Sequence, residues 1–197
     1  MKRVLFLIIY ACATAFIPFI TSAAEPAAAN TLPNETICYN VYFHMGFIWA
    51  KAGYGELSFR KQTLKDGTQQ YHGQLAAKSL SIVEHIMKVR DTLDCWFNEE
   101  MVPLKYRKGT HEGSYNAIAN NTYSSYWHKK DAANTLTNVD STQVKITRWR
   151  KKGKDEATVE TCNYSNPGVA YDMLTVFYSI RNLDYAHMAK GKKMQFV

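Results

Sequence analysis

The sequence lacks the short motifs that assign an enzyme class. His111-Glu112 does not open an H-E-x-x-H zinc motif, because position 115 is tyrosine, and no other histidine lies at a metal-ligand spacing. There is no G-x-S-x-G nucleophile elbow. Gly53 and Gly55 do not lead to the third glycine of a nucleotide-binding loop, since position 58 is serine. We therefore expect a protein that is not an enzyme and that has neither a metal site nor a cofactor.

Carboxylates are the one catalytic residue type that the sequence supplies in plenty. Asp91, Asp94 and Glu99 would offer the paired acids of a glycoside hydrolase. Any chain with 17 acidic residues contains such pairs, so a hydrolase is the least favoured of the functions considered.

Cysteine is also scarce, and its spacing excludes a redox motif or a zinc ribbon. The chain has four cysteines and no C-x-x-C pair. Cys12 lies in the N-terminal segment, which leaves Cys38, Cys95 and Cys162. Either one disulfide with one free thiol, or three buried thiols that act as small hydrophobic groups, fits this odd number.

The N-terminal segment has the layout of a secretory signal peptide. Lys2 and Arg3 precede an apolar stretch over residues 4–20, and Ser22-Ala23-Ala24 is a small-residue cleavage site. We expect cleavage after Ala24 and a periplasmic location. An uncleaved anchor fits less well, because the apolar run is short and contains Pro18. A lipoprotein cut at Cys12 is less favoured still.

Charge gives no reason to expect a nucleic-acid partner. Loss of residues 1–24 removes two of the 24 basic residues and none of the 17 acidic ones, so the formal net charge falls from +7 to +5. Such a surplus is typical of a solvated surface, with at most some affinity for anionic lipid or polysaccharide. The mature chain would be a flexible leader (25–34) and a single domain (35–197), and after cleavage it would not be an integral membrane protein.

Alternating apolar and polar residues predict a mainly β (α+β) fold. We expect a curved antiparallel sheet or half-barrel packed on one or two helices. Gly53 and Gly55 mark a bulge or a close backbone approach within this sheet, and Asp66-Gly67 marks a hairpin turn. Val144, Ile146 and Arg148 should share one strand face. Strands are predicted over 37–44, 47–50 with 55–60, 70–77, 89–97, from 102, two within 115–128 joined at Asn120-Asn121, 144–149 and 157–164, with a break at 165–168.

Two helices are predicted. Ser81 and Glu84 fit a capping box that opens a short helix over about 81–88. A second helix, over about 172–182, has Asp172 at its N-cap and apolar residues at helical spacing: Met173, Val176, Phe177 and Ile180.

Aromatic residues, 13% of the chain, are the main indication of a binding function. A curved sheet with an aromatic face either packs on its own helices or leaves an apolar cavity for a ligand. Because side chains alternate between faces, only about half of any run can line such a cavity. The candidate lining residues are Tyr39, Tyr42, Phe47, Trp49, Tyr54 and Phe59.

Three segments together resemble a known family. They are CYNVYFHMGFIWAKAGYGELSF, VRDTLDCWFNEEMVPLKYRKGTHEGSY and YDMLTVFYSIRNLDY, which span residues 38–59, 89–115 and 171–185. Their order and spacing resemble the exported bacterial family called domain of unknown function 3108, in its Bacteroidetes-like form. The resemblance implies a β-rich fold akin to the LolA/LolB lipoprotein carriers and no established activity. It also implies more strands beyond Val197, so we expect a C-terminally truncated domain.

The sequence thus favours an exported envelope protein that binds a lipid, a lipoprotein acyl chain or another apolar ligand in the concave face of its sheet. The alternative is a structural or interaction module of a cell-envelope assembly, with another envelope protein as its partner.

Overall fold

The structure is a computed structural model that describes residues 32–45, 47–127, 139–181, 183, 185, 188–191 and 193. The predicted signal peptide, most of the predicted leader and the last four residues lie outside these ranges. Among the described residues, no helix is long and apolar enough to cross a membrane.

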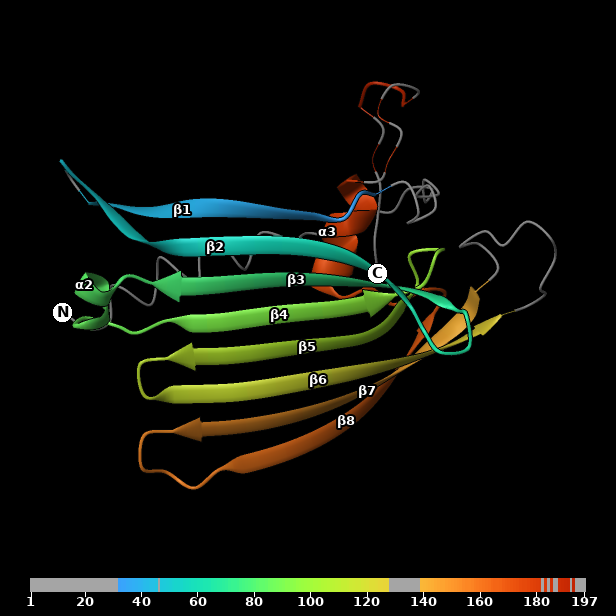
Figure 1. Cartoon of the computed structure of the whole chain (residues 1–197). Helices are drawn as coiled ribbons and strands as arrows, with labels where there is room; N and C mark the ends of the chain where they lie inside the picture. The colour runs from blue at the N-terminus through green and yellow to red at the C-terminus, as the bar shows by residue number, and fades with distance from the viewer. Residues whose placement is uncertain are drawn as a thin grey trace.

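Eight antiparallel strands form one sheet in sequence order, so each strand pairs with its neighbours in the chain. The sheet curls around the helix α3 and stays open, with β1 at one edge and β8 at the other (Figure 1). This confirms the predicted mainly β class. The strands are β1 (Glu35–Met45), β2 (Ile48–Thr63), β3 (Gln69–Ser79), β4 (Arg90–Phe97), β5 (Pro103–Glu112), β6 (Tyr115–Trp127), β7 (Val139–Lys152) and β8 (Thr158–Pro167).

Two predicted interruptions of the sheet are wrong. Asn120 and Asn121 do not join two strands but lie inside β6, where both pair in register with β5 and β7. Strand β8 does not break at Ser165 but runs to Pro167. Proline is tolerated there because the strand lies at the sheet edge and ends at that residue.

The glycines of the 53–55 segment act as the sequence predicts. Strand β2 runs through them without a break, and the register with β1 shifts so that Ala52 has no partner strand residue. A side chain at Gly53 would overlap the backbone carbonyl of Lys78 in β3. Gly53 therefore permits a close approach between the backbones of β2 and β3. The bulge beside it shifts the alternation, so each residue of β2 before Ala52 points to the face opposite the one that regular alternation would give.

Helix α2 (Ser81–Glu84) is shorter than predicted, and its predicted capping box does not form. Its N-cap is Leu80, which makes no side-chain cap hydrogen bond. Glu84 instead forms an ion pair with Arg90 of β4. A carboxylate with a guanidinium in reach gains more from that pair than from a backbone N–H.

Helix α3 (Met173–Arg181) begins as predicted, with Asp172 as its cap. One Asp172 carboxylate oxygen accepts the backbone N–H groups of Leu174 (3.0 Å) and Thr175 (2.8 Å), and the other accepts the Thr175 hydroxyl (2.7 Å). The buried helix face consists of Leu174, Thr175, Tyr178 and Ser179. The stripe of Met173, Phe177 and Ile180 read from the sequence is exposed, because Tyr178 fixes the opposite side against the sheet.

The core lies between α3 and strands β2 to β4. The Phe59, Tyr71, Phe97 and Tyr178 rings pack with centroids 5.2–6.1 Å apart. The Tyr178 hydroxyl donates to the carbonyl of Ser58 (2.8 Å), so its polar atom is satisfied at the base of the core. An ion pair between Arg181 and Glu35 ties the end of α3 to β1.

All three described cysteines are free thiols. Only Cys95 is fully buried, and burial raises the pKa of its thiol. Cys38 is exposed on β1 and Cys162 is half-buried on β8. The described cysteines match neither arrangement that the sequence left open: none of the three forms a disulfide, and only Cys95 is a buried hydrophobic residue.

Gly73→Ala tests how α3 is seated. A methyl group there would overlap the Tyr178 ring and lie 2.9 Å from the Cys95 sulfur, so the ring has to move. We expect a loss of about 1–3 kcal/mol in the free energy of unfolding, measured by urea denaturation.

Gly55→Ala is the matched control, because its methyl group would meet Tyr39 at an ordinary 3.7 Å. If both variants unfold at the same urea concentration, α3 does not pack on Gly73 as described.

Candidate ligand-binding site on the inner face of the sheet

The two faces of the sheet differ in chemistry. We call the face on which α3 packs the inner face and the opposite one the outer face. Strand alternation and register assign residues to the faces, because directly paired residues point the same way. One row of paired residues crosses the inner face from β1 to β8: Ile37, Leu57, Leu75, Leu93, Lys108, Ala119, Arg148 and Glu160. The row is aliphatic on β1 to β4 and changes to charged residues from β5 onward.

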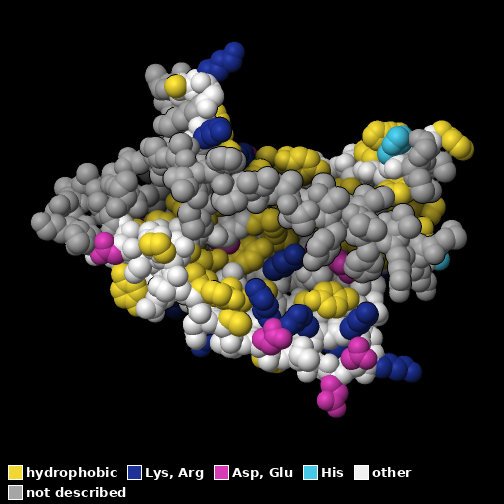
Figure 2. All heavy atoms as spheres, turned by 180° about the vertical axis from the view of Figure 1, so that it is seen from behind, with side chains coloured by type: hydrophobic (Ala, Val, Ile, Leu, Met, Phe, Trp, Pro, Cys, Tyr) yellow, Lys and Arg dark blue, Asp and Glu magenta, His cyan; other side chains and the backbone are white. Residues whose placement is uncertain are grey.

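Lys108 and Arg148 flank Ala119 in this row. One strand separates their own strands, so their backbones lie about 10 Å apart. Ala119 leaves the space between the two long side chains open. Both cations are exposed, and neither forms an ion pair or hydrogen bond with any residue that the structure describes. Figure 2, which shows the side turned away from the viewer of Figure 1, has several Lys and Arg side chains gathered among hydrophobic ones.

Other charged residues around this row are already compensated. Arg150 forms an ion pair with Glu160 across β7 and β8. Asp91 and Glu112 share a hydrogen bond between their carboxyl groups. Burial, with the charge of Asp91, raises the pKa of Glu112. Lys108 and Arg148 form no ion pair or hydrogen bond within the described residues, although the charge of Lys108 acts on Glu112.

Apolar side chains lie between α3 and these cations. Tyr106 and Tyr123 are buried, and burial raises the pKa of each phenol, so both rings are neutral. Leu75 and Ile146 are half-buried against the core cluster. Tyr39 on β1 and Tyr164 on β8 are about half exposed at the two edges of this face. The inner face therefore combines an apolar floor with a pair of free cations.

The six predicted lining residues do not share one surface. Phe59 lies in the core beneath α3, and Tyr39 faces inward from β1. Tyr42 pairs with Lys51 beyond the bulge, and its ring contacts Trp49, while the Lys51 ammonium lies 4.1 Å from the Tyr54 ring. These contacts place Tyr42, Trp49 and Tyr54 on the outer face. Phe47 lies in the β1–β2 turn and is 97% exposed.

Lys108 and Arg148 were not among the predicted site residues, although a signal for Arg148 was present. The alternation correctly put Arg148 on one face with Val144 and Ile146. Arg148 and Arg150 belong to the basic run RWRKKGK over residues 148–154 and lie within β7. Nothing in the sequence shows that Lys108 lies two strands away from Arg148.

The sheet also separates the residues of the rejected catalytic motifs. His111 and Glu112 are consecutive in β5, so they point to opposite faces. Asp91 faces inward, whereas Asp94 accepts hydrogen bonds from His72 (2.9 Å) and Gln74 (2.7 Å) on the outer face. Within the described ranges, no group of His, Cys, Asp and Glu is arranged to hold a metal ion. The Asp91–Glu112 pair is in direct contact, closer than the roughly 5 Å between the carboxyl groups of retaining glycosidases.

The fold and this face define a class of protein: a single open antiparallel sheet, curled around one helix, with an inner face that is part apolar and part basic. A family model matches residues 38–196, and the chain belongs to that family, which is described as a protein of unknown function (DUF3108). Neither the curated proteins nor the solved structures contain a match.

Glu112→Gln tests the carboxyl pair. A raised pKa in the folded state means that the fold binds this proton more tightly than the unfolded chain does, so stability falls as pH rises from about 4.5 through the folded pKa. A glutamine still donates to Asp91 but does not titrate. We expect the variant to lose this part of the pH dependence in urea denaturation at a series of pH values. An unchanged pH dependence would contradict the shared hydrogen bond.

Proposed function

We propose that this protein binds an amphiphile with an anionic headgroup, such as a lipid or the acylated end of a lipoprotein, on the inner face of its sheet. The observation that carries the proposal is the row in which aliphatic side chains give way to Lys108, Ala119 and Arg148. The proposal includes export to the periplasm, for which the N-terminal segment is the support.

The apolar part of the ligand would lie on the floor between α3 and the cations. Leu75, Ala117, Ala119 and Ile146 are only half-buried there, so a hydrocarbon chain that covers them gains about 25 cal/mol for each Å² removed from water. The same contact would remove the ring of Tyr39 or Tyr164 from water at the edges of the face.

The charged part would lie between Lys108 and Arg148. An Arg guanidinium and a Lys ammonium on either side of a small residue can both donate to one phosphate or carboxylate. The acidic residues nearest to them are already engaged, since Glu160 pairs with Arg150 and Glu112 bonds to Asp91. A neutral apolar ligand would leave both cations unused, so charge selects the anionic form.

Lys108→Gln combined with Arg148→Gln tests the headgroup contact. Isothermal titration calorimetry with lysophosphatidylglycerol, below the concentration at which it forms micelles, measures the affinity. Hydrogen bonds to a charged partner contribute about 1.5–3 kcal/mol each. We therefore expect the double variant to bind this lipid at least about tenfold more weakly.

Lys105→Gln combined with Arg107→Gln is the matched control, because these basic residues lie on the same strand as Lys108 but face outward. Its affinity should equal that of the wild type. Lysophosphatidylcholine, which carries no net charge, should bind more weakly, and its affinity should be the same for the wild type and both variants. A wild-type protein that binds neither lipid, or an inner-face variant that binds as the wild type does, would contradict the proposal.

A second candidate function, an interaction module of an envelope assembly, is favoured by the open edges of the sheet. Strands β1 and β8 each pair with only one strand in the described part of the chain. Backbone groups at a free edge can pair with a strand of a partner protein. A photo-crosslinking residue at Cys38 of β1 would capture that partner in intact cells, and recovery of no specific protein would count against this function.

A further inference from the structure

We infer that the outer face at one end of the molecule docks on the surface of an anionic membrane. The proposal concerns a different surface from the inner face and does not depend on a ligand there. It rests on where exposed apolar side chains, aromatic rings and basic groups meet.

Antiparallel topology brings four connections to the same end of the molecule. In a sheet whose strands follow sequence order, the β1–β2, β3–β4, β5–β6 and β7–β8 connections all lie at one end. Figure 1 shows the β1–β2 hairpin extending beyond the other strands at this end, with α2 below it. The Leu80 amide, at the start of α2, donates to the carbonyl of Ala52 (2.8 Å), which ties α2 to the base of the hairpin.

The apolar residues at this end protrude into solvent. Phe47 is 97% exposed and Trp49 is 66% exposed at the hairpin tip, while Ile82 and Ile86 around α2 are 74% and 80% exposed. We call these four residues the apolar tip. They lie at a hairpin tip and around a short helix, and none of them lines the described pocket, so a deformable partner suits them best. Aromatic and aliphatic side chains of this kind enter the interfacial layer of a bilayer.

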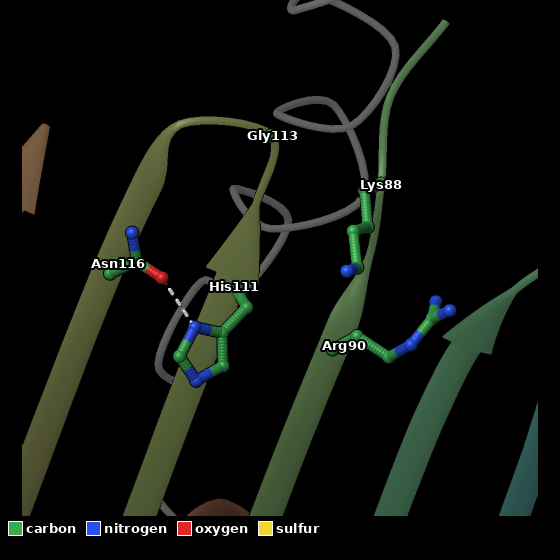
Figure 3. A pocket seen from close by; sticks show the side chains of 5 residues that line it. All are labelled: Lys88, Arg90, His111, Gly113 and Asn116. Atoms are coloured by element: carbon green, nitrogen blue, oxygen red, sulfur yellow. Dashed lines mark hydrogen bonds between the residues drawn. The ribbon is translucent and has the colours of Figure 1, made fainter. Parts of the chain in front are cut away.

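Basic groups surround the apolar tip on the outer face. The Lys51 ammonium lies over the Tyr54 ring, and Tyr54 pairs in register with Lys78, which pairs with Arg90. Lys88, Arg90 and His111 line a pocket of about 220 Å³ together with Gly113 and Asn116 (Figure 3). This arrangement places cations where the phosphates of lipid headgroups would lie when the apolar tip is inserted.

Local acidic charge does not cancel this basic surface. Glu84, the acidic residue of α2, is already paired with Arg90. The guanidinium of Arg90 also donates to the Ser79 hydroxyl (3.1 Å) and the Val89 carbonyl (2.7 Å), so it is held at the pocket. The His111 ring contacts the Asn116 side chain at the opposite wall. The one charge of Glu84 also acts on Lys78 and Lys88, so together with Lys51 these residues keep a positive surplus. That surplus would attract an anionic surface, which is why we assign a membrane and not a neutral apolar partner.

Vesicle co-sedimentation tests the proposal. The protein is purified in the form that accumulates in the cell, with its N-terminus identified by mass spectrometry, and is mixed with vesicles of phosphatidylcholine alone or with added phosphatidylglycerol. We expect binding to the mixed vesicles that weakens as salt is raised, and little binding to phosphatidylcholine. Phe47→Ser should weaken binding about tenfold. The variant lacks the apolar ring whose transfer from water into the bilayer contributes to the free energy of binding.

Matched variants separate the apolar tip from the rest of the surface. Val159→Ser removes a hydrophobic residue from β8, at the opposite edge of the sheet from the hairpin. Val159 is 66% exposed, the same fraction as Trp49, and the variant should bind as the wild type does. Lys51→Gln with Lys88→Gln should weaken binding to the mixed vesicles several-fold, whereas Lys65→Gln with Lys145→Gln, away from this end, should not. All these side chains are exposed or half-buried, so unchanged thermal unfolding verifies that each variant is folded.

Three outcomes would overturn the proposal. The first is binding by Phe47→Ser equal to that of the wild type, and the second is no vesicle binding at all. The third is a dimer in solution that Phe47→Ser dissociates while vesicles capture nothing, since the apolar tip would then contact a second copy. The variant with Lys108→Gln and Arg148→Gln should still bind vesicles, so a failure of the inner-face ligand does not imply a failure of the membrane contact.

Discussion

The packing of Tyr178 on Gly73 is the contact on which the rest of the structure depends. The absence of a side chain at Gly73 lets the ring lie directly on β3, between Phe59 and Phe97, and the hydroxyl reaches the Ser58 carbonyl. Burial raises the pKa of Tyr178, which keeps this donor protonated. One helix seated in this way covers one end of the inner face and leaves the remainder of that face to the residues of β5 to β8.

Strand alternation then divides the chemistry between the two faces. The inner face receives aliphatic residues on β2 to β4 and the free cations Lys108 and Arg148 on β5 and β7. The bulge at Ala52 turns Trp49 to the outer face, where its ring contacts Tyr42. Two amphipathic surfaces therefore coexist on one sheet. A protein that holds an anionic amphiphile on one surface and contacts a membrane with the other would suit the transfer of lipid to or from a bilayer.

Most of the fold could be predicted from the sequence, whereas the site could not. Period-two alternation, Asp66-Gly67 and the Asp172 cap are local signals, and the structure contains the elements that they predict. Glu84 was misassigned because its partner Arg90 lies on the next strand. Alternation alone puts Tyr42 and Tyr54 on the face opposite Tyr39, but it would put Trp49 on the inner face. A one-residue bulge, which leaves no clear mark in the sequence, turns Trp49 outward. Lys108 and Arg148 meet only through the order of strands, which composition and spacing do not encode.

If Lys108 and Arg148 hold the headgroup of an anionic amphiphile on the inner face, the ligand must change the environment of their strands. Nuclear magnetic resonance measures this change by following backbone amide shifts while lysophosphatidylglycerol is titrated into the isotope-labelled protein. We expect the largest shifts at Lys108, Ala119 and Arg148, with smaller ones at Leu75 and Ile146. Shifts confined to the hairpin tip and α2, or no saturable shifts at all, would contradict this binding mode.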